Sequence, residues 1–155
     1  MMVILFSAIA IIVILISIWT YYSLYQKRKA IELSFKEIEE QLSLRNDYIP
    51  NLVSVVRIFA AKEKDKLKAI TELRSAITNE HLTVDKRIAI NNQISSTIQD
   101  IKDAAKNYPS LLACENFIIL LRKLSEIEIK ISKSSAEYNN LISNYNSSIH
   151  GARLS

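Results

Sequence analysis

Hydrophobic residues fill the first part of the chain without interruption. From Val3 to Tyr22 the sequence contains no Asp, Glu, Lys or Arg. A helix rises about 1.5 Å per residue, so about 20 apolar residues cross the hydrocarbon core of a bilayer, whereas a soluble helix of this length would show a polar face. The pattern therefore predicts a transmembrane anchor over residues 1–25.

The residues at the C-terminal end of this segment favour a retained anchor with a cytoplasmic bundle. Aromatic side chains prefer the headgroup level, and basic residues next to a first span tend to stay in the cytoplasm. A cleaved signal peptide is the alternative, but no basic segment precedes the apolar run and no small-residue cleavage site follows it. We therefore predict a single-pass protein in contact with membrane lipid. The anchor residues are Val3, Ile12, Trp19, Tyr21, Tyr22, Lys27, Arg28 and Lys29.

Beyond the anchor, apolar residues recur every seven positions, which is typical of a coiled-coil-like seam. One row contains Leu24, Ile31 and Ile38, and a second contains Phe35, Leu42 and Ile49. Because the first row begins among the aromatic residues, we predict one helix that leaves the membrane without a linker and extends to about residue 46.

Pro50 is the first residue that disfavours a helix. It lacks a backbone donor and biases Ile49 away from helical angles, while Asp47 can cap a following helix. A turn and a kink are both compatible with these residues. Pro50 and Asn51 are also compatible with a polar break that holds a partner, although a capped turn is the simpler interpretation.

Three further helices are predicted over about residues 50–78, 84–107 and 110–149, with Thr83 and Ser110 as N-caps. The third carries Val84, Ile88, Ile94, Ile98, Ile101 and Ala105 on one face. The last repeats every seven residues through Phe117, Leu124, Ile131, Tyr138 and Tyr145, which predicts a left-handed supercoil. The predicted fold is therefore all-α: an anchor that continues into an elongated antiparallel three- to four-helix bundle over residues 26–155.

Composition and charge agree with a helical membrane protein. The 155 residues include one Gly and two Pro, which leaves few residues for hairpin turns. The net charge of +4 arises after the span, and acidic residues are interspersed with basic ones, so we do not predict a nucleic-acid partner. Cys114 is the single cysteine, which excludes an intramolecular disulfide.

We find no group of residues that an enzyme would require. The only glycine is Gly151, so a glycine-rich phosphate loop is missing. His81 and His150 are far apart in sequence, and the Glu-x-x-His pairs of di-metal bundles do not occur. We therefore predict no catalytic residue, no metal site and no cofactor.

Two stretches resemble the LemA family: residues 44–53, and the segment from Tyr108–Pro109 to the Tyr-Asn pairs of the last helix. With the anchor, the likeness extends over about residues 1–149. It implies a bacterial inner-membrane protein, an antiparallel helical bundle on one anchor, and no established enzymatic activity. Residues 150–155 depart from the aromatic tail usual in the family. The motif residues are Arg45, Asp47, Ile49, Pro50, Asn51, Leu52, Tyr108, Pro109, Tyr138, Asn139, Tyr145 and Asn146.

We predict a non-enzymatic scaffold that self-associates at the membrane, because extended seams often leave apolar surface for another copy. An accessory subunit that binds a different membrane protein is the alternative, and assembly of the purified protein alone would distinguish the two. A hydrolase or metal enzyme is least expected. The candidate assembly seam consists of Phe35, Leu42, Phe117, Leu124 and Ile131.

Overall fold

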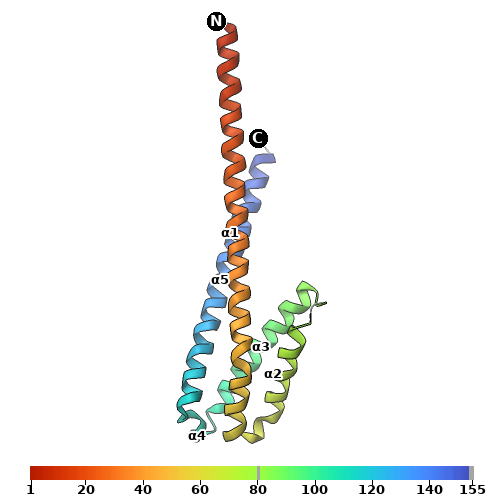
Figure 1. The fold of residues 1–155 in the computed structure, drawn as a ribbon, viewed down its shortest axis with the longest axis vertical. Helices are drawn as coiled ribbons and strands as arrows, with labels where there is room; N and C mark the ends of the chain where they lie inside the picture. Colours follow the sequence, from red (N-terminus) through yellow and green to blue (C-terminus); the bar gives the residue numbers. More distant parts are fainter. Residues whose placement is uncertain (80, 154–155) are drawn as a thin grey trace. The chain divides into compact units, whose positions relative to one another are not determined.

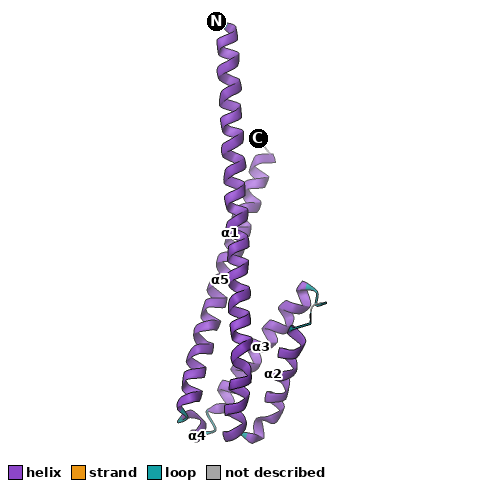
Figure 2. Ribbon diagram, in the orientation of Figure 1, coloured by secondary structure: helices purple, strands orange, loops and turns teal. Residues whose placement is uncertain are grey.

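Helices make up nearly all of the chain in the computed structural model (Figure 2), which describes residues 1–79 and 81–153. The elements are α1 (Met2–Phe59), the 3-10 helix η1 (Ala61–Glu63), α2 (Lys64–Ile77), α3 (Val84–Ala105), α4 (Pro109–Leu112) and α5 (Glu115–Arg153). The described part contains no strand, so the predicted all-α class is confirmed. The last two residues of the atypical C-terminal end lie outside the described residues.

The chain forms two compact units, and each contains a part of α1 and a part of α5. The bundle unit comprises Glu39–Ser132, and the paired-helix unit comprises Met1–Ile38 with Lys133–Ser155. The predicted division into an anchor over residues 1–25 and a domain over residues 26–155 stays a prediction.

The bundle unit has one apolar core, to which α1, α2, α3, α4 and α5 contribute. Short connections join these elements, and successive long helices run antiparallel (Figure 1). Burying one Leu or Ile side chain stabilises a fold by about 1.5–3 kcal/mol, so this cluster is the main source of stability in the unit. Its residues are Ile49, Leu52, Val53, Val56, Ala60, Leu67, Ile70, Ile77, Ile94, Ile98, Ile101, Ala105, Leu111, Phe117 and Leu124.

The predicted helix boundary between residues 46 and 50 is wrong. α1 continues through Pro50 to Phe59, and the backbone leaves helical angles at Ala60, where φ is −135° and ψ is 55°. Asp47 is therefore an exposed residue within a helix and not a cap. The helix can continue because Pro50 is exposed and because the carbonyl that it cannot bond finds another donor, described below.

The later boundaries agree more closely with the sequence. Thr83 caps α3, since its hydroxyl accepts from the backbone N–H of Lys86. Ser110 is not a cap, because Pro109 occupies the first position of the four-residue helix α4, where its missing donor costs nothing. The predicted helix over residues 110–149 is consequently two helices, α4 and α5.

The burial of the first turns of α3 differs from the predicted apolar face. Val84 and Ile88 are exposed, although they lie on the predicted apolar face. The buried part of α3 begins at Ile94 and continues through Ile98 and Ile101. The apolar stripe is thus longer than the surface that the bundle unit covers.

In the paired-helix unit, α1 and α5 are joined by an aromatic contact and a polar contact. The rings of Phe35 and Tyr138 lie 5.8 Å apart at an interplanar angle of 45°, and Lys27 Nζ donates to Ser148 Oγ at 2.6 Å. Ser34 and Ser134 are buried, and such small side chains allow two helices to approach closely.

The first part of α1 is long and apolar enough to span a membrane. None of this apolar segment is covered by the protein. The large hydrophobic side chains of the segment, including Val3, Ile12 and Trp19, are exposed.

Candidate functional site: a buried arginine in the helical bundle

Arg45 is the most deeply buried charged residue of the described chain, with 1% of its surface exposed. Its side chain crosses from α1 to two other helices. Nη1 donates to Ser95 Oγ at 2.6 Å and to Glu128 Oε1 at 3.1 Å, and Nη2 donates to Asn91 Oδ1 at 2.7 Å. Ser95 in turn donates to the Glu128 carboxylate. One guanidinium thus connects α1, α3 and α5.

The charge of Arg45 is stabilised by this network and disfavoured by its burial. Desolvation lowers the pKa of Arg45, and the Coulomb attraction and hydrogen bond of Glu128 oppose the shift. An arginine remains protonated under such conditions, so the site holds a permanent positive charge. Glu128 is 28% exposed and connects this charge to solvent. The arrangement joins three helices of the bundle unit through one charged side chain.

Pro50 creates a second polar connection. It has no N–H to donate to the carbonyl four residues earlier, which belongs to Asn46. Arg74 Nε of α2 donates to this carbonyl at 2.9 Å. A helix that contains a proline needs such a substitute donor, and here the donor also joins α1 to α2.

Tyr108 forms a contact between two turns of the bundle unit. Its hydroxyl donates to Glu63 Oε1 at 3.0 Å, and Glu63 also pairs with Lys66. These two donors, Lys66 first, lower the pKa of Glu63, and the bond to Glu63 raises the pKa of Tyr108. The Tyr-Pro pair therefore fastens the turn before α4 to the turn between α1 and α2.

The motif between residues 44 and 53 has a buried and an exposed face. Ile49 and Leu52 are in the core with Arg45, whereas Asp47, Pro50 and Asn51 are exposed. Asn51 lines a groove of about 360 Å³ between α1 and α5. The other lining residues are Ser54, Val55, Asn116, Ile119 and Leu120. We refer to it as the α1–α5 groove.

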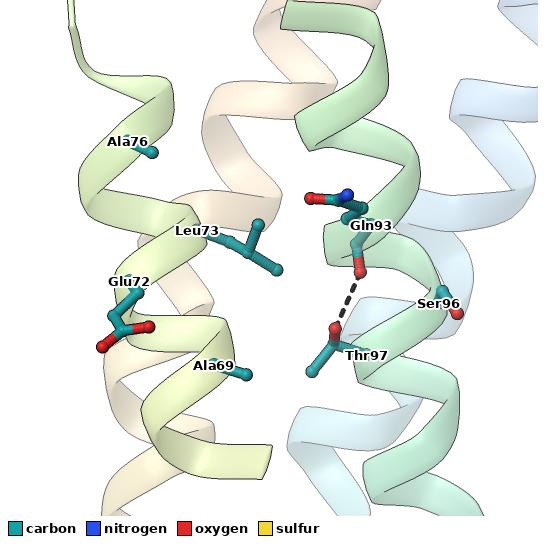
Figure 3. Close-up of a pocket in the computed structure, with 7 residues that line it drawn as sticks. All are labelled: Ala69, Glu72, Leu73, Ala76, Gln93, Ser96 and Thr97. Carbon is teal, nitrogen blue, oxygen red and sulfur yellow. Dashed lines mark hydrogen bonds between the residues drawn. The ribbon is translucent and has the colours of Figure 1, made fainter. Parts of the chain in front are cut away.

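A second groove, of about 450 Å³, lies between α2 and α3 (Figure 3). Leu73 points into the space between the helices, and the Thr97 hydroxyl donates to the carbonyl of Gln93 at 2.8 Å. Small side chains, including Ala69, Ala76 and Ser96, leave the space open. The α2–α3 groove is a concave surface into which few polar groups converge.

The remaining predicted residues are distributed over both units. Phe117 and Leu124 are fully buried in the core of this chain, so they are not accessible for assembly; the seam prediction is corrected for these two residues. Leu42 and Ile131 are half-buried, and Phe35 is half-exposed against Tyr138. Tyr145 is half-buried, whereas Asn139 and Asn146 are exposed.

The described residues contain no group of three or more His, Cys, Asp or Glu side chains placed to hold a metal ion. His81 and His150 are both exposed, and Cys114 is half-buried. The absence of a cofactor stays a prediction.

The sequence identified Arg45 but none of its partners. Asn91, Ser95 and Glu128 lie 46 to 83 positions away along the chain. The available signal was the polar interruption of an apolar stripe, since Asn91 and Ser95 share a helix face with Ile98. A polar pair on a core face indicates a buried polar group on the facing helix.

Comparison with known proteins gives one family. The model described as the LemA family matches residues 34–153, which include the Arg45 network, the Asn46–Arg74 contact and the Tyr-Asn pairs. No curated protein matches the chain.

Proposed function

Because the chain belongs to the LemA family, we propose that it is a non-enzymatic membrane-anchored scaffold that self-associates through its helical bundle. The apolar segment of α1 provides the anchor, with the bundle unit in the bacterial cytoplasm. α1 is one uninterrupted helix, so the same element contains the anchor and the core residues Ile49 and Leu52.

Apolar surface beside the α1–α5 groove carries the proposal of self-association. Ile119, which lines the groove from α5, is 45% exposed. Ile58, one helical turn after the lining residue Ser54 on α1, is 75% exposed. Exposed apolar side chains that gather beside a groove are typical of interaction surfaces. Asn51 and Asn116 supply a polar rim, as protein interfaces commonly have. A second copy can bury this surface by presenting the same face.

The mass of the full-length protein in mild detergent tests this proposal. The wild type should be an oligomer, and Ile58→Glu with Ile119→Glu should shift it towards a monomer because each charge would be buried in the interface. Ile129→Glu is the matched control, since Ile129 is also an exposed isoleucine of α5 but lies more than two helical turns from Leu120, the last groove residue on that helix. A wild-type monomer at every concentration would refute self-association.

The accessory-subunit alternative has the α2–α3 groove in its favour. An amphipathic helix of another protein can lie in such a groove, where small side chains allow close approach. Under this alternative the purified protein is a monomer, and Ala76→Trp, which fills the groove, abolishes co-purification of the partner. Unchanged co-purification with Ala76→Trp would exclude the groove as the binding site.

A further inference from the structure

A pocket of about 240 Å³ lies in the paired-helix unit, at the end of the apolar segment. Tyr21, Leu24, Tyr25 and Arg28 line it from α1 with a spacing that places them on one helix face, and Tyr145 closes it from α5. The volume is about eight times the 30 Å³ that a water molecule takes in the liquid, which leaves room for a phosphate group and several attached atoms.

Once the span is inserted, the pocket lies at the level of the lipid headgroups. Arg28 follows Tyr22, the last residue of the apolar run from Val3 to Tyr22, by six positions, or about 9 Å along a helix. Helical side chains point back towards the N-terminus, so the guanidinium reaches the headgroup layer that borders the hydrocarbon. Tyr21 and Tyr25 lie between these levels, where amphipathic rings are favoured.

The pocket's chemistry favours an anion with an apolar attachment. The Arg28 guanidinium presents a planar set of donors that matches a phosphate, the tyrosine hydroxyls can donate, and Leu24 is apolar. Lys27, held by Ser148 of α5, and Lys29 add positive charge. Tyrosines can also surround a quaternary ammonium group, but the positive charge of Arg28 disfavours a cation here.

One carboxylate competes for Arg28. Glu32 Oε1 lies 3.7 Å from Arg28 Nε, and both side chains are about seven-tenths exposed. Such exposed pairs contribute little, so a phosphate can displace the carboxylate.

We propose that this pocket binds the phosphate headgroup of an anionic phospholipid. The inference rests on the proposed membrane anchoring and adds a specific lipid site to it. Tyr145 makes the site depend on α5 as well as on the anchor, so bound lipid stabilises the pairing of the two helices.

Trp19 allows a direct test, because it is the only tryptophan and lies two residues before Tyr21. The full-length protein is placed in phosphatidylcholine vesicles that contain a minor fraction of brominated phosphatidylglycerol, and quenching of Trp19 is compared with that by brominated phosphatidylcholine. We expect stronger quenching by phosphatidylglycerol. Arg28→Gln should weaken this preference about tenfold, the effect of losing one charge-assisted hydrogen bond.

Two matched controls distinguish binding in the pocket from general attraction between the positive charges and an anionic lipid. Lys29→Gln removes the same charge one residue away, and Tyr22→Phe removes a hydroxyl at the same depth; neither residue lines the pocket, so both should leave the preference within about twofold. Tyr145→Phe should weaken it. Equal effects of Arg28→Gln and Lys29→Gln would overturn the inference, because only the net charge would then matter.

The remaining outcomes distinguish the lipid from other sources and the site from the anchor. Millimolar inorganic phosphate should leave the quenching unchanged; loss of the preference would assign the pocket to free phosphate and overturn the lipid assignment. Equal quenching by both brominated lipids would overturn the site while supporting the anchor. If neither lipid quenches Trp19, the anchor itself is refuted.

Discussion

Arg45 has a charge that the bundle must neutralise, and Glu128 is the only anionic group bonded to it among the described residues. Removal of one partner of a buried pair leaves the other charge uncompensated, which costs about 3–5 kcal/mol. Because Glu128 is partly exposed, we expect Glu128→Ala to lower the free energy of unfolding by about 3 kcal/mol, the lower end of that range. Urea unfolding in mild detergent, followed by circular dichroism, measures this loss.

Glu126→Ala is the matched control for that prediction. Glu126 also lies on α5, but its partner Lys123 is 3.8 Å away and both side chains are about half-exposed. Its removal should cost less than about 0.5 kcal/mol. Equal losses for Glu126→Ala and Glu128→Ala would show that the Arg45 pair contributes nothing beyond a surface contact.

Pro50 and Arg74 should be coupled energetically through the carbonyl of Asn46. Arg74→Ala leaves this partly buried carbonyl without its donor, so we expect a loss of about 1–2 kcal/mol in the free energy of unfolding. In Pro50→Ala the helix regains its own N–H donor, and Arg74→Ala should then cost less than about 0.5 kcal/mol. A double-mutant cycle from urea unfolding of the four proteins gives the coupling energy; additive effects would contradict this account.

These roles could be predicted only in part at the residue scale. Periodicity placed Ile49 correctly on an apolar face, because that inference needs only neighbouring residues. The partners of Arg45 and the donor to Asn46 come from other helices, and nothing local in the sequence determines which helices meet. Proline's preference for helix ends was overridden at Pro50 because tertiary contact supplied the missing hydrogen bond.

Glu63 and Tyr108 link two turns, and this link makes the free energy of unfolding depend on pH. The pKa of Glu63 is lowered by Lys66 and then by Tyr108, so the stability it contributes is present above its ordinary pKa of 4.5 and is lost as the pH falls through the lower pKa of the folded state. We expect acid to reduce the free energy of unfolding of the wild type more than that of Glu63→Gln. Urea unfolding at a series of pH values gives both profiles.

Tyr108→Phe provides the control for the link between the turns. It removes one of the two donors but leaves Lys66, so its acid-dependent loss should be intermediate between those of the wild type and Glu63→Gln. Asp103, whose pKa is also lowered, mainly by Lys106, is present in all three proteins and does not affect the comparison. Identical acid profiles for the three proteins would exclude Glu63 as a pH-dependent contact.

Element boundaries were predictable where the cap is local. Thr83 bonds the amide three residues later, so the start of α3 follows from sequence alone. The end of α1 has no such signal, because Ala60 is neither a glycine nor a proline and no side-chain cap hydrogen bond forms at this position. Val84 and Ile88 show the converse case, in which an apolar stripe continues beyond the surface that covers it.

At the scale of the whole molecule, the predicted anchor implies that the protein resides in a membrane. The Leu, Ile, Phe and Val residues of the apolar segment favour insertion by about 4–7 kcal/mol in total, and one aspartate at the centre opposes it by about 2.5–3.5 kcal/mol. Ile9→Asp with Ile12→Asp should therefore cancel the gain and release the protein from membranes on alkaline carbonate extraction, whereas Ile12→Asp alone should leave most of it bound. Ile118→Asp with Ile129→Asp places the same charges on exposed positions of α5 and should remain in the membrane fraction. Extraction of the wild type itself would refute the anchor, and equal release of both double variants would show that added charge, not its position in the apolar segment, controls the outcome.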